Sequence, residues 1–211
     1  MTRPFNLSRW FAVTALASIA ALATVIGLLL NNFLAERMLA QEASLTQEFV
    51  NSLLLVETEF VRYTADPALR REGQAPQSFE HLTRIPDVLR TNLYDREQKL
   101  IWSSDPAMIG RTFDRNPELE RALAGEVVAE REEHEHEGEG KAEHQALPER
   151  YAMFVEIYVP VRESASGPVL GAIEFYKRPL ALARSLAQLQ LYIALGAVIG
   201  GALLFAALFG L

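Results

Sequence analysis

The sequence predicts an α+β domain, an antiparallel sheet with long flanking helices, set between two transmembrane helices. Two charge-free apolar runs bracket about 160 residues of mixed polarity, in which helical periodicity gives way to strand alternation. The runs, residues 10–30 and 191–211, are each about 20 residues long, enough to cross a hydrocarbon core of about 30 Å. We therefore expect a two-pass membrane protein.

The N-terminal tail predicts the orientation of the chain. Arg3 and Arg9 precede the first run with no acidic residue beside them, so residues 1–9 are expected to be cytoplasmic. Residues 31–190 would then lie in the periplasm, as the external domain of a multi-pass protein of the cell inner membrane. A cleaved signal peptide is the competing interpretation, although the run exceeds the ~7–15 residues of a signal core.

Composition excludes several partners and sites. The chain has 27 Asp and Glu against 20 Lys and Arg, a formal net charge of −7, and its acids lie mainly in the middle segment. Nucleic acids and anionic lipid surfaces favour clustered Lys and Arg, so neither is expected as a partner. The absence of cysteine excludes disulfides and thiolate metal sites.

Two helices are expected before the first strand. The first continues from the membrane span to about Asp66, because the residue before Pro67 avoids the helical region. Its apolar residues recur at helical spacing, at Met38, Leu45, Phe49, Leu53, Val56 and Phe60. The second, shorter helix is expected over residues 78–90, with Pro86 near its end.

The following segment predicts a hairpin and a capped helix. Residues 93–95 and 100–103 read as paired strands around a four-residue turn. After a loop, Asn116 is a suitable N-cap for a helix that begins with proline and ends at Gly125. Another strand is expected around residues 126–130.

Two alternating segments predict the last strands, residues 151–161 and 169–175, and a helix from Pro179 leads into the second span. One face of this hairpin is apolar and is expected to be buried. The opposite face carries Phe154, Glu156, Tyr158, Glu174 and Tyr176. This mixture suits either a solvated surface or the wall of a pocket.

This order of elements resembles the PAS-like single-Cache, or PDC, sensor domain. The stretches that carry the resemblance are residues 93–95, 100–106, 109–111 and 116–123, and it extends over roughly residues 33–190. Such domains form the extracytoplasmic input of bacterial sensor histidine kinases and of some chemoreceptors and cyclases. Gln98 departs from the pattern, because similar domains often carry glycine in the hairpin turn.

The resemblance implies a ligand cavity between the sheet and the loop and helix that cover it. The candidate lining residues are Tyr94, Trp102, Arg111, Tyr158 and Tyr176. An arginine can hold an anionic ligand through its planar donors, and aromatic residues supply apolar walls with polar tips. The alternative interpretation makes Trp102 a core residue and Arg111 a surface residue.

An acidic segment at residues 130–148 contains His134, His136 and His144 among many glutamates. Imidazole and carboxylate groups are suitable ligands for a divalent metal such as zinc, nickel or copper. The alternative is a solvated loop, because the segment is too polar to bury much surface. No other cofactor is expected, and the 211 residues contain no nucleophile elbow or phosphate loop that would indicate an enzyme.

The second span carries Gly196 and Gly200 four residues apart, a spacing that lets two helices approach closely in lipid. Together with the resemblance, this predicts the input half of a homodimeric two-component sensor histidine kinase. It would bind a small extracytoplasmic ligand and reach a cytoplasmic response regulator through a catalytic part beyond Leu211. A chemoreceptor or cyclase output, or a stand-alone membrane-anchored metal-binding protein, is the alternative.

Overall fold

The computed structural model describes residues 7–71, 75–76, 79–83, 85, 87–113, 116–133, 153–164, 166–178 and 180–209. The chain divides into two compact units. One consists of Met1–Met38 and Ala181–Leu211, and the other of Leu39–Leu180. Each unit is described separately below.

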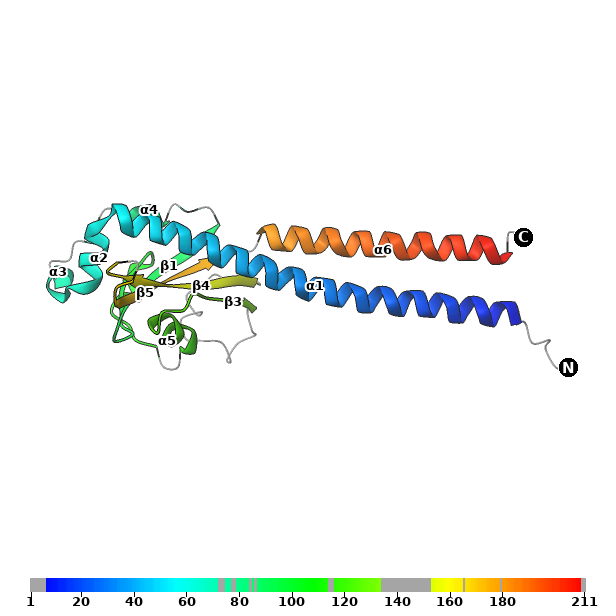
Figure 1. Ribbon diagram of the computed structural model, residues 1–211, viewed down its shortest axis with the longest axis horizontal. Coiled ribbons are helices and arrows are strands. Elements are labelled where there is room, and N and C mark those ends of the chain that lie inside the picture. The colour runs from blue at the N-terminus through cyan, green and yellow to red at the C-terminus, as the bar shows by residue number, and fades with distance from the viewer. Residues whose placement is uncertain are drawn as a thin grey trace. The chain divides into compact units, whose positions relative to one another are not determined.

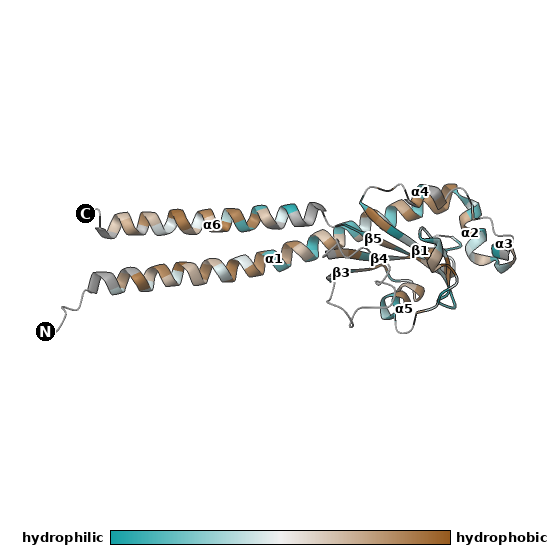
Figure 2. Ribbon diagram, turned by 180° about the vertical axis from the view of Figure 1, so that it is seen from behind, coloured by the Kyte–Doolittle hydropathy of each residue, from teal (hydrophilic) through white to brown (hydrophobic). Residues whose placement is uncertain are grey.

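The first unit is helical and apolar (Figure 2). It contains the N-terminal part of α1 (Leu7–Val56) and nearly all of α6 (Leu180–Phe209). Both helices include a stretch long and apolar enough to cross a membrane, within Val13–Val56 and Ala187–Ala207. This criterion uses length and composition only, and a signal sequence also meets it. A Cβ atom added to Gly27 would lie 3.4 Å from Ile193, so the two helices pack closely at this glycine.

The second unit contains a five-stranded antiparallel sheet in the order β2-β1-β5-β4-β3. The strands are β1 (Val88–Asp95), β2 (Leu100–Ser103), β3 (Val128–Glu133), β4 (Met153–Arg162) and β5 (Val169–Lys177). The end of α1, α2 (Thr58–Ala65) and α4 (Phe79–Thr83) lie on one face of the sheet, and α5 (Pro117–Leu123) lies on the other (Figure 1). The short helices α3 (Pro67–Arg71) and η1 (Pro106–Met108) complete the unit.

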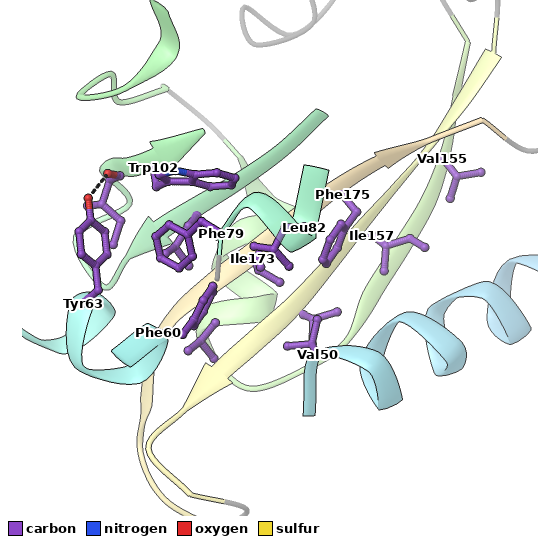
Figure 3. Close-up of a cluster of buried hydrophobic side chains, with 14 residues drawn as sticks. Val50, Phe60, Tyr63, Phe79, Leu82, Trp102, Val155, Ile157, Ile173 and Phe175 are labelled. Carbon is purple, nitrogen blue, oxygen red and sulfur yellow. Dashed lines mark hydrogen bonds between the residues drawn. The ribbon is translucent and has the colours of Figure 1, made fainter. Parts of the chain in front are cut away.

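The main hydrophobic core lies between the sheet and α1, α2 and α4 (Figure 3). The alternating apolar residues of the last two strands supply its floor: Val155, Ile157, Val159, Val161, Ile173 and Phe175. Phe79 of α4 lies near its centre, with its ring centroid 4.6 Å from that of Phe60. The apolar face expected for this hairpin is therefore buried, because alternation sends every second side chain to the same side.

Local signals predicted two features correctly. Asn116 caps α5, because its side-chain oxygen accepts a hydrogen bond from the Leu119 backbone N–H at 2.7 Å. In the turn between β1 and β2, Asp95 accepts backbone hydrogen bonds from Glu97 at 3.2 Å and Lys99 at 2.9 Å. Gln98 has φ 62°, the left-handed conformation that glycine adopts most readily.

The expected helix over residues 78–90 is wrong in its length. The described helix α4 ends at Thr83, and β1 begins at Val88. Pro86 disfavours a continuous helix, and pairing of Val88 with Lys177 and of Arg90 with Tyr176 places this segment in the sheet. The long first helix is also interrupted at Glu57, so that α2 is a separate helix, and the third strand is displaced to Val128–Glu133.

Candidate functional site

The sheet face opposite the main core is buried and polar. Seven side chains of β1, β4 and β5 line it, and we call them the buried polar layer: Arg90, Asn92, Tyr94, Glu156, Tyr158, Glu174 and Tyr176. Arg90 is 3% exposed and the other six are 0% exposed. Ionisable groups are costly to bury, so a layer of this composition marks a candidate functional site.

Strand register arranges six of the seven side chains in two rows, and Tyr94 lies beyond them, opposite Ala172. In one row Glu174 of β5 lies between Asn92 of β1 and Tyr158 of β4. In the other row Tyr176 of β5 lies between Arg90 and Glu156. Residues opposite each other on paired strands have side chains in contact range, so β5 is at the centre of the site.

Hydrogen bonds fix the first row. Asn92 donates from Nδ2 to Oε2 of Glu174 at 2.7 Å, and the Tyr94 hydroxyl donates to the same oxygen at 3.0 Å. Ser103 of β2 donates to Oδ1 of Asn92 at 2.7 Å. This contact orients the Asn92 amide so that its N–H group faces the carboxylate.

A cation–π contact organises the second row. The Arg90 guanidinium carbon lies 4.2 Å from the centroid of the Tyr176 ring. A cation over an aromatic face at this distance is attracted by the negative potential of the ring, more strongly where water is excluded. The site therefore already holds one cation against a tyrosine.

Burial changes the protonation equilibria of the layer. Burial, and secondly the charge of Glu156, raises the pKa of Glu174 above its ordinary value of 4.5, against the opposing effect of polar contacts with Tyr158, Tyr176 and Asn92. Burial and the nearby glutamates raise the pKa values of Tyr158 and Tyr176 well above 10. The two tyrosines are thus neutral hydrogen-bonding groups at physiological pH.

Helix α5 and the loop before it cover part of this face. Met108, Leu119 and Ala122 pack with Tyr94 and Tyr158 in a second apolar cluster. The N-cap residue Asn116 also donates from Nδ2 to the Tyr158 hydroxyl at 3.1 Å. The cap therefore joins the beginning of α5 to the buried polar layer.

Among solved structures, the chain is similar to the sensor domain of the V. cholerae histidine kinase DctB, with a TM-score of 0.51 and 18% identity. The similarity covers 80% of this chain and 60% of that one, so this chain spans about 60% of the DctB chain. The chain has the PAS-like Cache sensor fold.

Other comparisons add less to this assignment of the Cache fold. The ligand-binding domain of the Pseudomonas aeruginosa PAO1 amino acid chemoreceptor PctC, in complex with GABA, matches at 15% identity over 70% of this chain and 63% of that chain. Its TM-score of 0.31 is too low to support an argument. No protein-family model and no curated protein matches the sequence.

The Cache domain brings together three of the five candidate ligand residues. Tyr94, Tyr158 and Tyr176 all belong to the buried polar layer. Trp102 lies on the other face, in the main core, with its ring centroid 4.9 Å from that of Phe79. Arg111 is exposed, and its backbone oxygen accepts a hydrogen bond from Leu100 at 2.9 Å. Ligand binding by these residues stays a prediction.

Sequence reasoning missed Arg90 and Asn92 as residues of this face. The helix expected over residues 78–90 includes Arg90, and the period-two spacing of Arg90, Asn92 and Tyr94 is the signal that could have indicated a strand. Glu156 and Glu174 were placed on the correct face of the hairpin. Their burial depends on the elements that cover that face, which alternation alone does not reveal.

The expected metal site lies outside the described residues. His134, His136 and His144 fall within residues 134–152, of which the structure describes nothing, while the beginning of this acidic segment belongs to β3. Across the described part of the chain, no group of three or more His, Cys, Asp or Glu residues is placed to hold a metal. Metal binding by the three histidines stays a prediction.

Proposed function

We propose that residues 39–180 are an extracytoplasmic sensor domain for a small ligand, anchored by α1 and α6 in the cell inner membrane. The Cache fold supports this proposal, and the buried polar layer carries it. The layer buries two carboxylates and a guanidinium, whose desolvation is costly and which an apolar sheet face would avoid. Such a cost is common at binding sites, where polar groups give ligand specificity.

The connectivity of β5 supports a route from the layer to the membrane. Glu174 and Tyr176 belong to β5, which ends at Lys177, and α6 begins at Leu180. The Lys177 ammonium contacts Oε2 of Glu42 on α1 at 2.7 Å. A shift of β5 on ligand binding would thus act on α6 through the chain and on α1 through this ion pair. Ligand would favour one of two arrangements of the helices.

We propose further that the domain is the input of a dimeric sensor histidine kinase that acts on a response regulator. The similarity to a histidine kinase sensor domain favours this output over a chemoreceptor or cyclase. On α6, Gly196 and Gly200 have no described atom within 4 Å of the position of an added Cβ, so this face is open to a second copy. The reading frame downstream of codon 211 tests the output, since it would encode a phosphoacceptor helix and an ATP-binding domain.

Two experiments on the full chain test the sensor proposal, and both exploit the absence of native cysteine. In intact cells, Glu120→Cys should react with a membrane-impermeant maleimide, because Glu120 is exposed on the domain surface and the proposed orientation puts it outside the cytoplasm. A cysteine at position 2 should react only after lysis, which makes it the matched control. Labelling of position 2 alone in intact cells would contradict the proposed orientation.

The second experiment measures signalling between helices. Glu36→Cys and Gln190→Cys, each alone, report the approach of two copies by disulfide crosslinking in membranes. A panel of small carboxylates and amines is added, and compounds that raise the thermal stability of the chain should also change the crosslinking yield. Yields that are equal with and without every stabilising compound would refute ligand-dependent transmission.

A further inference from the structure

The buried polar layer carries more acid than base. Glu156 and Glu174 contribute two carboxylates, and Arg90 contributes one guanidinium. The two glutamates lie on adjacent strands, with Glu156 opposite Tyr176 and Glu174 opposite Tyr158, which makes them diagonal neighbours on one face. Each raises the electrostatic cost of ionising the other, and the influence of Glu156 on Glu174 is the second largest after burial. The layer therefore favours an additional positive charge.

The two oxygens of Glu174 have different surroundings. Oε2 accepts hydrogen bonds from Asn92 at 2.7 Å and from Tyr94 at 3.0 Å. Oε1 is buried and has no hydrogen-bond partner among the described residues. A buried carboxylate oxygen without a donor is strongly unfavourable, so Oε1 needs its own proton, a hydrogen bond from the neighbouring Tyr158 or Tyr176 hydroxyl, or an outside donor. A proton would create a buried O–H group that itself needs an acceptor.

Tyrosine side chains lie next to Glu174 in the buried polar layer. Tyr94 and Tyr158 adjoin Glu174 in the layer, and Tyr176 presents its ring to the Arg90 guanidinium at 4.2 Å. Rings of this kind stabilise cations by their faces, and carboxylates stabilise them by charge-assisted hydrogen bonds. An ammonium group would satisfy the missing hydrogen bond and the excess negative charge together.

We propose that the buried polar layer binds a small ligand through a primary ammonium group, with Oε1 of Glu174 as its hydrogen-bond acceptor. Glu156 supplies the second negative charge, and the tyrosines supply the aromatic wall. This inference rests on the proposed sensing function and specifies its ligand class. Because Oε1 is buried, a ligand reaches it only if the elements packed over this face move, and α5 and Met108, which pack against Tyr94 and Tyr158, are the described elements placed to do so.

Three probes of one size separate the possible chemistries: propylammonium, propionate and 1-propanol, each at millimolar concentration and neutral pH. Thermal unfolding of the full chain in lipid nanodiscs is followed by the fluorescence of the core residue Trp102. Trp10 is the second tryptophan of the chain, so the measurement uses a Trp10→Phe background. Propylammonium should raise the unfolding midpoint, and propionate and propanol should not.

Glu174→Gln is the decisive variant, because the amide keeps an oxygen for Asn92 and Tyr94 but removes the charge. It should weaken propylammonium binding about 10- to 100-fold, the range for one charge-assisted hydrogen bond. Glu120→Gln removes the same charge from the exposed surface of α5 and should bind like the wild type. Should Glu174→Gln fail to fold, Glu156→Gln tests the same site and should weaken binding at least several-fold.

The remaining outcomes overturn the inference. If propionate stabilises the chain and propylammonium does not, the layer is an anion site; this result would overturn the ammonium proposal but leave the proposed sensing function intact. Equal affinity for propylammonium in Glu174→Gln and wild type would place the amine elsewhere. If none of the probes binds and Glu174→Gln only increases stability, Oε1 simply carries a proton and the inference is wrong. Failure of the sensor proposal is seen separately, in the labelling and crosslinking experiments.

Discussion

Replacement of Asn116 by alanine should destabilise the domain of residues 39–180 by about 2–4 kcal/mol. The side chain is 1% exposed and has two roles. Its oxygen caps α5 through the Leu119 N–H at 2.7 Å, which contributes about 1 kcal/mol. Its Nδ2 group donates to the buried Tyr158 hydroxyl at 3.1 Å, and loss of a buried partner costs about 1–3 kcal/mol.

A series of variants separates the two roles. Asn116→Ser retains a capping oxygen but lacks the amide donor, so it should lose only the Tyr158 contribution of about 1–3 kcal/mol. In a Tyr158→Phe background the hydroxyl is absent, and Asn116→Ala should then cost only the cap, about 1 kcal/mol. The double-mutant cycle should give a coupling energy of about 1–3 kcal/mol between the two residues.

Urea unfolding of the full chain in detergent micelles measures these differences, with Trp102 fluorescence as the signal in the Trp10→Phe background. The slope of the free energy against urea should stay constant across the series, which shows that the extent of unfolding is unchanged. A serine variant as unstable as the alanine variant, or a coupling energy near zero, would refute the double role of Asn116.

Three further predictions concern the layer, the core and the second span. Burial raises the folded-state pKa of Glu174 above 4.5, so the contribution of its protonated form to stability is present below the unfolded pKa and is lost as pH rises through the folded pKa. The stability of Glu174→Gln relative to the wild type should therefore increase with pH. Urea unfolding from pH 4 to 8 measures this difference, and parallel stability curves for the two proteins would contradict the prediction. Phe79→Ala, at a ring 1% exposed, should cost about 3–5 kcal/mol in the same assay, and a loss below 1 kcal/mol would show that the core collapses around the gap. Gly196→Leu should reduce crosslinking of Gln190→Cys several-fold, with Val198→Leu at another exposed position of α6 as the control, and an unchanged yield would exclude the Gly196 face from the proposed dimer.

The sequence allowed most elements to be predicted where short-range signals decide them. Asn116 before proline predicted the start of α5, and alternation predicted which side chains of β4 and β5 enter the core. Arg90 could not be placed in this way. Its strand depends on pairing with Tyr176, far away in the chain, and on the hydrogen bond from the Arg178 N–H to the Asp87 oxygen at 2.8 Å.

The candidate site was predictable only in part for the same reason. Alternation placed Glu156 and Glu174 together on one face, but it left open whether that face is solvated. The answer depends on the packing of Leu119 and Ala122 of α5 against Tyr158, a contact between elements that are distant in sequence. Burial, and therefore the altered acidity of Glu174, is a property of the assembled domain.

The same strands serve two purposes at alternate positions. In β5, Ile173 and Phe175 pack in the main core, and Glu174 and Tyr176, which alternate with them, belong to the buried polar layer. Exchange of the residues on one side leaves the apolar contacts on the other side in place. During evolution such a strand can change the chemistry of its polar face without rebuilding its scaffold, so the proposed recognition of one compound can give way to that of another while the shape is kept.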